Sequence, residues 1–205
     1  MKEKSSVEEI FFKFLLQYKF DEKDLDYSVM EKHAVALQTL SNIGNSGISV
    51  FDVYKRQVAF YSSNFGALLG YVPTDYEKTG QQFFEDRIHV EDKLKLSHQG
   101  VSVFKIFNNL SSEDKLNHKV INEYRMLNAQ NKYVRLIEQY QVLELDKKGQ
   151  LWLLISIVDL SPNQEEYNGI KSQLLNFRTG KIIPVEVTQK AQHELTKRET
   201  EILRL

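Results

Sequence analysis

The side chains that could carry acid-base or metal chemistry are five histidines and two pairs of adjacent acidic residues. The histidines, at positions 33, 89, 98, 118 and 193, do not have metal-ligand spacing. Glu85 and Asp86 are consecutive, as are Glu91 and Asp92, so the two carboxylates of each pair would point in different directions on a helix. Phosphate loops, dinucleotide fingerprints, HExxH and nucleophile elbows do not occur. We therefore predict no catalytic residue, no metal site and no enzyme, although a small-molecule-converting enzyme on an α+β shell stays an alternative.

Charge and cysteine content narrow the class of protein further. The 205 residues carry 27 basic and 28 acidic side chains, so the basic surplus that favours nucleic-acid binding is missing. The chain has no cysteine, which fits a reducing cytoplasm and excludes thiolate metal sites. The most apolar run, residues 151–158, is far shorter than the roughly 20 residues of a membrane span. The N-terminus lacks the unbroken apolar region of a signal peptide. We expect a cytoplasmic protein without a membrane segment.

The elements that must position these side chains begin with two N-terminal helices, which together make up a segment over residues 1–44. Capping pairs at Ser6 and Glu9 and at Ser28 and Glu31 predict helices over residues 6–20 and from 28 to a stop at Gly44. The first helix has a broad apolar face, which either the body of the protein or a second copy must cover. We predict a homodimer through this face, with the contact residues Phe11, Phe14, Leu15 and Tyr18.

A sheet is predicted for the centre of the chain. β-Branched and aromatic residues predict a hairpin over 48–54 and 57–61, then helices over 62–109, one of which ends near Gly70. Three further strands follow over 118–127, 133–145 and 150–160, separated by the turns NAQN and DKKG. We therefore predict one α+β domain over 45–161, with an antiparallel five-stranded sheet and helices on one face. Residues 162–194 are interpreted as a connector with a helix near 167–176, a turn at 178–180 and a short extended run.

Several phrases in this order resemble a PAS sensory domain. VAFYSSNFGALLGY (58–71) is similar to its second strand and first short helix, and IHVED (88–92) to the start of its long helix. EYRMLNAQNKYVRL and DKKGQLWLLISIVDLS resemble its closing hairpins. Val90 stands where the family usually has Pro, and Tyr133 where it often has Trp. The resemblance implies a PAS-like fold and a module that senses or relays a signal through a pocket on the helical side of the sheet.

The content of that pocket stays open. The candidate pocket residues are Phe60, Phe104, Tyr124 and Leu154. A flavin that forms a cysteine adduct is excluded because the chain has no cysteine, and haem would need His89 or His98 as its axial ligand. A non-covalent flavin, a small metabolite, a protein partner or a core filled by the protein's own side chains remain, so the cofactor is unknown.

The last eleven residues resemble the beginning of a DNA-binding domain. LTKRETEILRL (195–205) is similar to the opening of the LuxR-type helix-turn-helix domain, and Thr196 and Glu199 form its capping box. The resemblance implies the sensory part of a transcription regulator that is truncated within the first helix of its DNA-binding domain. DNA would then be bound only through the missing C-terminal domain, because the groove-reading helix comes later. The alternative is an input fragment of a sensor histidine kinase, since His193-Glu194-Leu195 resembles part of the phosphoacceptor box.

Overall fold

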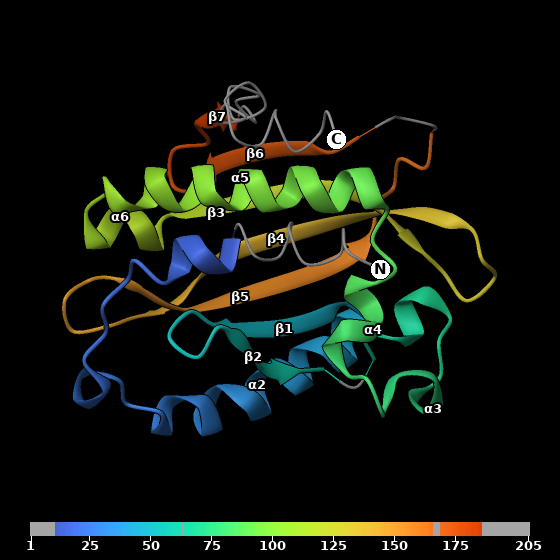
Figure 1. Cartoon of the computed structure of the whole chain (residues 1–205), viewed down its shortest axis with the longest axis horizontal. Helices are drawn as coiled ribbons and strands as arrows, with labels where there is room; N and C mark the ends of the chain where they lie inside the picture. Colours follow the sequence, from blue (N-terminus) through green and yellow to red (C-terminus); the bar gives the residue numbers. More distant parts are fainter. Residues whose placement is uncertain (1–10, 63, 166–168, 186–205) are drawn as a thin grey trace, which may run out of the picture.

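A single antiparallel sheet forms the centre of the protein (Figure 1). The computed structural model describes residues 11–62, 64–165 and 169–185. The sheet contains seven strands in the order β2-β1-β5-β4-β3-β6-β7. Their bounds are β1 Gly47–Asp52, β2 Gln57–Tyr61, β3 His118–Leu127, β4 Tyr133–Leu145, β5 Leu151–Leu160, β6 Lys171–Asn176 and β7 Ile182–Pro184. The helices are η1 Glu22–Asp24, α2 Ser28–Gly44, η2 Ala67–Leu69, α3 Pro73–Tyr76, α4 Gln81–Glu85, α5 Val90–Asn108 and α6 Ser112–Leu116.

The predicted α+β class and the first five strands are confirmed. β1 pairs with β2 in a hairpin, and β3, β4 and β5 form an antiparallel meander that returns β5 to the side of β1. The helices between β2 and β3 include the predicted long helix, α5, and the short helix that ends at Gly70 with a left-handed φ of 79°. This is the PAS-like order of elements that the sequence predicted.

The sheet is wider than predicted. Residues 171–176 form strand β6 beside β3, so the helix expected near 167–176 is wrong in its described part. β7 then pairs with β6 after the predicted turn, in which Gly180 has a φ of 73°. The physical reason is the free edge of β3, whose backbone groups need partners, together with the burial of Leu174 under the helices. The division of the chain into domains stays a prediction.

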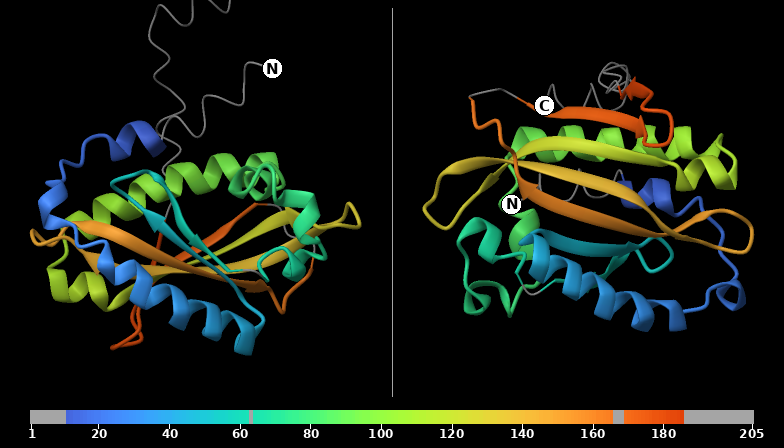
Figure 2. Two further views of the ribbon diagram at one scale, coloured as in Figure 1. Left: turned by 90° about the horizontal axis from the view of Figure 1, so that it is seen from below. Right: turned by 180° about the vertical axis from the view of Figure 1, so that it is seen from behind.

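Helices cover both faces of the sheet (Figure 2). α5 and the helical residues 11–15 lie on one face, and α2 lies on the other. Leu25 and Leu37 pack there against Ile48, Val50 and Trp152. None of the helices in the described ranges is long and apolar enough to cross a membrane.

The ends of α2 differ from their prediction. Its N-cap is Tyr27 without a side-chain cap, and the Asp26 carboxylate instead accepts the backbone N–H of Ser28 at 3.0 Å. The Tyr27 hydroxyl donates to buried Asp52 at 2.7 Å, which joins the start of the helix to the sheet. The helix ends as a left-handed cap, but Asn45 takes that conformation and Gly44 is the last helical residue.

The predicted helix over residues 6–20 is described only from residue 11 and ends near residue 15. The capping pair at Ser6 and Glu9 lies outside the described residues, as does the sequence 193–205 that resembles an output domain.

One ion pair joins the start of α5 to the sheet. Asp92 is fully buried and accepts hydrogen bonds from the Arg125 backbone N–H at 2.9 Å, from Nε at 2.9 Å and from Nη2 at 2.7 Å. Burial raises the pKa of the Asp92 carboxyl, but the hydrogen bonds and charge of Arg125 lower it by more, so the net shift is downward. Asp92 therefore stabilises the position of α5 on the sheet as well as the helix start that the sequence indicated.

The variant Asp92→Asn should lose about 3 kcal/mol of unfolding free energy, because it leaves Arg125 without its buried carboxylate. Urea denaturation at pH 7 measures this loss. Since the folded-state pKa is lowered, this stability is present above the unfolded pKa near 3.8 and is lost as pH falls through the folded pKa. The difference in unfolding free energy between the two proteins should therefore shrink below about pH 4.

Glu91→Gln is the matched control: Glu91 contacts the same Arg125 at 3.4 Å from an exposed position, and its loss should cost less than 1 kcal/mol. Equal effects of the two variants would contradict this assignment.

Candidate ligand-binding site

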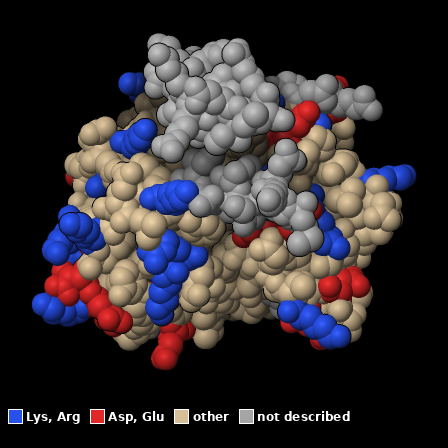
Figure 3. All heavy atoms as spheres, viewed as in Figure 1, with Lys and Arg blue, Asp and Glu red and all other residues tan. Residues whose placement is uncertain are grey.

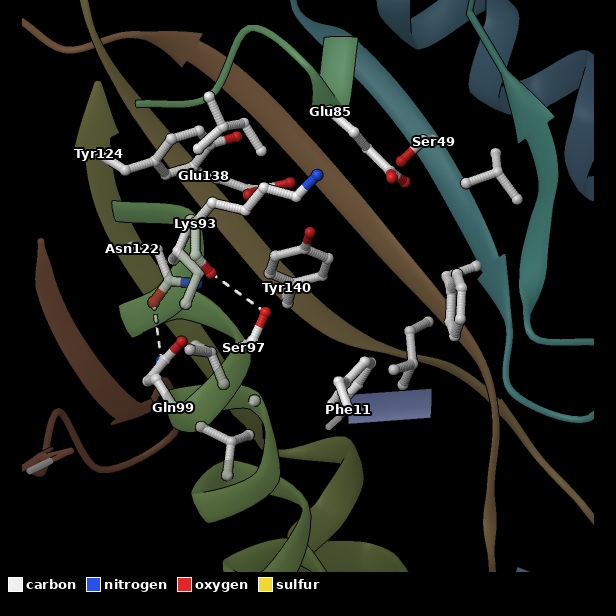
Figure 4. A pocket seen from close by; sticks show the side chains of 18 of the residues that line it. Phe11, Ser49, Glu85, Lys93, Ser97, Gln99, Asn122, Tyr124, Glu138 and Tyr140 are labelled. Atoms are coloured by element: carbon white, nitrogen blue, oxygen red, sulfur yellow. Dashed lines mark hydrogen bonds between the residues drawn. The ribbon is translucent and has the colours of Figure 1, made fainter. Parts of the chain in front are cut away.

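A cavity of about 300 Å³ lies between the sheet and the helices on the α5 side (Figure 4). Strands β1 to β5, helices α4 and α5 and the N-terminal residues 11 and 12 all contribute to its lining. The strands reach it with alternate residues, so that Asn122 and Tyr124 of β3 face it beside Glu138 and Tyr140 of β4. A cavity of this size is at the lower end of the range for small-molecule sites.

One end of the cavity is apolar. Its lining there is Phe11, Phe12, Phe51, Phe104, Phe107, Val142, Leu151 and Leu154. The Phe11 ring meets the Phe104 ring edge-on, with 5.5 Å between centroids. Gly100 of α5 makes room for this contact, because a Cβ atom there would lie 3.1 Å from the Phe11 ring. The N-terminal segment therefore forms part of the cavity wall.

The other end is polar and centres on Glu138. This side chain is buried in the middle of β4, and the Ser156 hydroxyl of β5 donates to its carboxyl at 2.5 Å. Desolvation raises the pKa of Glu138, while hydrogen bonds from Ser156, Tyr140 and Tyr124 lower it, and the net shift is upward. Burial next to Glu138 also raises the pKa of Tyr124 and Tyr140, which stay neutral phenols. The polar end can therefore offer both hydrogen-bond donors and acceptors.

The Tyr61 hydroxyl is a further polar group of the lining. It is buried and has no hydrogen-bond partner among the residues that the structure describes. Burial and the nearby Glu138 carboxyl raise its pKa, so it is a neutral phenol. A buried hydroxyl without a partner is costly, which makes Tyr61 a natural contact for a bound molecule.

Three of the four predicted pocket residues, Phe104, Tyr124 and Leu154, line the cavity. Phe60 does not, because it packs on the opposite face of the sheet with Val50. The cause is a β-bulge in the hairpin: Phe51 pairs with Val58 but Val50 pairs with Phe60, so Ala59 is the extra residue. The bulge reverses the alternation after Val58, which turns Phe60 away from the cavity.

Tyr61 and Glu138 were not among the pocket residues predicted from the sequence. The same bulge turns Tyr61 into the cavity, and no feature of the sequence marks the bulge. Glu138 could have been found, since Leu136, Glu138, Tyr140 and Val142 alternate along β4 and place one acidic residue on an otherwise apolar and aromatic face. An acidic residue at such a position is a candidate for a functional role.

The histidines considered for haem do not reach the cavity. Neither His89 nor His98 lines it. His89 is the N-cap of α5, where its carbonyl accepts the Lys93 N–H at 2.9 Å and its ring packs edge-on against Tyr133. Within the described ranges no group of three or more histidine and acidic residues could hold a metal ion.

The residues predicted to form a dimer contact pack against the protein's own core. Leu15 is only 1% exposed, and Phe14 and Tyr18 meet the Phe104 ring edge-on, as Phe11 does. From the sequence, either the body of the protein or a second copy could cover this apolar face. In the structure, residues of the protein's own core pack against it. Leu15 is therefore not available to a second copy in this arrangement, and the homodimer stays a prediction.

On the face drawn in Figure 3, Lys and Arg side chains occur together with Asp and Glu side chains. This agrees with the formal net charge of −1.

Comparisons with known proteins find similarity to solved structures. No protein-family model matches the sequence, and no curated protein matches it. An RNA-binding Light-Oxygen-Voltage receptor is similar with a TM-score of 0.42 and 13% identity, over 56% of this chain and 27% of that one. A sensory box histidine kinase/response regulator from Burkholderia thailandensis E264 has a TM-score of 0.40 and 14% identity. The match covers 82% of this chain and 98% of that one. The VqmA dimer from Vibrio cholerae, described with LuxR-type receptors, has a TM-score of 0.38 and 12% identity. The match covers 58% of this chain and 49% of that one. This chain thus spans about a quarter of the first structure, and its fold assignment rests on its own strand order.

The contact between Phe11 and Gly100 can be tested with a double-mutant cycle. Glycine inside a helix costs about 1 kcal/mol relative to alanine, so Gly100→Ala should stabilise the Phe11→Ala protein by about that amount. In the wild-type background the new methyl group meets the Phe11 ring, so the gain should be smaller or reversed. Urea denaturation of the four proteins measures the coupling. Identical effects in both backgrounds would show that residue 11 does not pack on α5.

Proposed function

We propose that this chain is the sensory part of a transcription regulator, in which a small molecule binds the cavity and controls a LuxR-type DNA-binding output. The observation that carries the proposal is the cavity itself, since its wall contains residues attached to both flanking segments of the PAS-like fold. A ligand that fills the cavity can shift the packing of both flanks, because binding favours the conformation that it contacts best.

The N-terminal flank reaches the cavity directly. Phe11 and Phe12 form part of its lining, and Phe11, Phe14 and Tyr18 surround the Phe104 ring. A ligand beside Phe104 would contact the same ring that holds this segment against α5. Binding and the position of the N-terminal segment are therefore coupled in the proposed mechanism.

The C-terminal flank reaches the cavity through hydrogen bonds. Gln99 of α5 and Asn122 of β3 both line the cavity, and the Gln99 amide donates to Asn122 at 2.8 Å. Ser172 of β6 donates to the same Asn122 oxygen at 2.7 Å and is also hydrogen-bonded to Gln99. A ligand that moves Gln99 or Asn122 would disturb the attachment of β6, the strand that leads toward the proposed output.

The proposed output rests on the sequence of the last eleven residues, LTKRETEILRL. A regulator of this kind would act as a homodimer, because two-fold operators require paired DNA-binding domains. A protein partner in place of a small ligand, the input part of a histidine kinase, and an enzyme on the same shell are the alternative functions.

The sensor proposal predicts a bound molecule in protein purified under non-denaturing conditions. Native mass spectrometry should show an adduct on the wild-type protein that Leu154→Trp loses, because the larger ring fills the apolar end of the cavity. Val35→Trp is the control, since Val35 is 73% exposed on α2, and it should keep the adduct. An adduct that survives Leu154→Trp in a folded protein would place the ligand elsewhere. Absence of any adduct would favour a protein partner.

The output proposal is tested by reading the gene beyond the codon for Leu205. Codons for a turn and a groove-reading helix should follow, as in a helix-turn-helix domain. An ATP-binding domain would support the kinase alternative, with His193 as its phosphoacceptor. A stop codon directly after Leu205 would contradict a DNA-binding output.

A further inference from the structure

We infer that the cavity takes a small, largely apolar molecule with an uncharged or cationic head group that donates a hydrogen bond to Glu138 and contacts the Tyr61 hydroxyl. This inference rests on the proposed sensory function and specifies the chemical class of its ligand. Acidic ligands, with a carboxylate or phosphate head, are disfavoured.

The Glu138 carboxyl is the central acceptor of the polar end. The structure gives this carboxyl one hydrogen bond with a distance, from the Ser156 hydroxyl at 2.5 Å. A carboxyl group has more acceptor positions than one donor fills, so acceptor positions are left for a ligand. Glu138 lies on the cavity side of β4 and is 7% exposed, so a donor in the cavity reaches it without competition from bulk water.

The charges around Glu138 disfavour an anion. A second carboxyl, Glu85 of α4, lines the same cavity, and so does one ammonium group, Lys93 of α5. Figure 4 shows Glu85, Glu138 and Lys93 around this end of the cavity. Two carboxyls and one ammonium give no net positive charge as long as either carboxyl is ionised. A carboxylate ligand would thus be desolvated without a surplus of positive charge to balance it, which is costly.

The Tyr61 hydroxyl supplies a second, independent indication of a polar ligand atom. It is buried on the cavity side without a partner among the described residues, whereas the comparable Tyr71 hydroxyl donates to the Leu127 carbonyl at 3.0 Å. A ligand head group between β2 and β4 would give Tyr61 the partner that the described chain does not. Tyr61 and Glu138 therefore define two sides of one head-group site.

The rest of the cavity limits the ligand body. Beyond the head-group site, the lining consists of rings and branched chains, including Phe51, Phe104, Phe107 and Leu154. Contact between such a surface and an apolar or aromatic group of the ligand stabilises the complex. The volume of about 300 Å³ restricts that body to one small ring or a short chain.

Three probes with one body and different heads test the ligand class on the full chain: 2-phenylethylamine, 2-phenylethanol and phenylacetate. We expect the amine and the alcohol to bind, measured by isothermal titration calorimetry at pH 7, and phenylacetate to bind at least tenfold more weakly. Binding of the first two should also raise the melting temperature of the protein.

Two variants locate the head group, and one serves as a control. Tyr61→Phe removes only a hydroxyl without a described partner, so it should weaken binding of the alcohol and the amine about fivefold to tenfold while leaving the melting temperature of the free protein unchanged or higher. Glu138→Gln should weaken binding of the amine more than that of the alcohol. Tyr71→Phe loses an internal hydrogen bond outside the cavity lining, so it should lower the melting temperature and leave binding within twofold.

The inference fails if phenylacetate binds as tightly as the amine, if Tyr61→Phe binds the alcohol and the amine like the wild-type protein, or if none of the three probes binds. These outcomes do not decide the sensory function, which is tested by native mass spectrometry of the purified protein. A copurified molecule that Leu154→Trp displaces would support a sensor with a ligand of another class, whereas its absence would count against a small-molecule sensor and favour a protein partner.

Discussion

Coverage of the apolar side of the sheet that faces α5 is the constraint on which the rest of the structure depends. Strands β1 to β5 present a wide surface of aromatic and branched residues there, and α5 alone does not cover it. The remaining cover comes from α4 and from the N-terminal segment, whose Leu15 is buried and whose Phe11 packs into the space beside Gly100. Between these elements and the sheet the cavity remains, so the same packing problem produces both the core and the site.

The opposite face of the sheet explains why α2 belongs to the folded body. β5 lies in the sheet interior and is buried on both sides: Leu154 faces the cavity, while Leu153 and Ile155 face α2. A strand with this pattern needs a helical cover on each side. The hydrogen bond from Tyr27 to Asp52 then fixes the start of α2 against the hairpin of β1 and β2.

Both flanks of the PAS-like fold therefore have a physical link to the cavity wall, and the two links differ in kind. The N-terminal link is a cluster of rings around Phe104, which responds to volume. The C-terminal link is the hydrogen-bond set of buried Gln99 and Asn122 with half-buried Ser172, which responds to polar contacts. A ligand with an apolar body and a polar head would address both, which is consistent with the proposed sensor and with the inferred ligand class.

The sequence by itself determined the α+β class, the first five strands and the long helix, because these follow from local periodicity and turn residues that act within a few positions. It also indicated three residues that line the cavity, Phe104, Tyr124 and Leu154. Tertiary structure decided the rest. The bulge at Ala59 places Tyr61 rather than Phe60 in the cavity. Residues 171–176 form a strand because they pair with the free edge of β3. The apolar face of residues 11–18 packs against the core. Each of these outcomes depends on which distant surface lies opposite, and no local pattern encodes that.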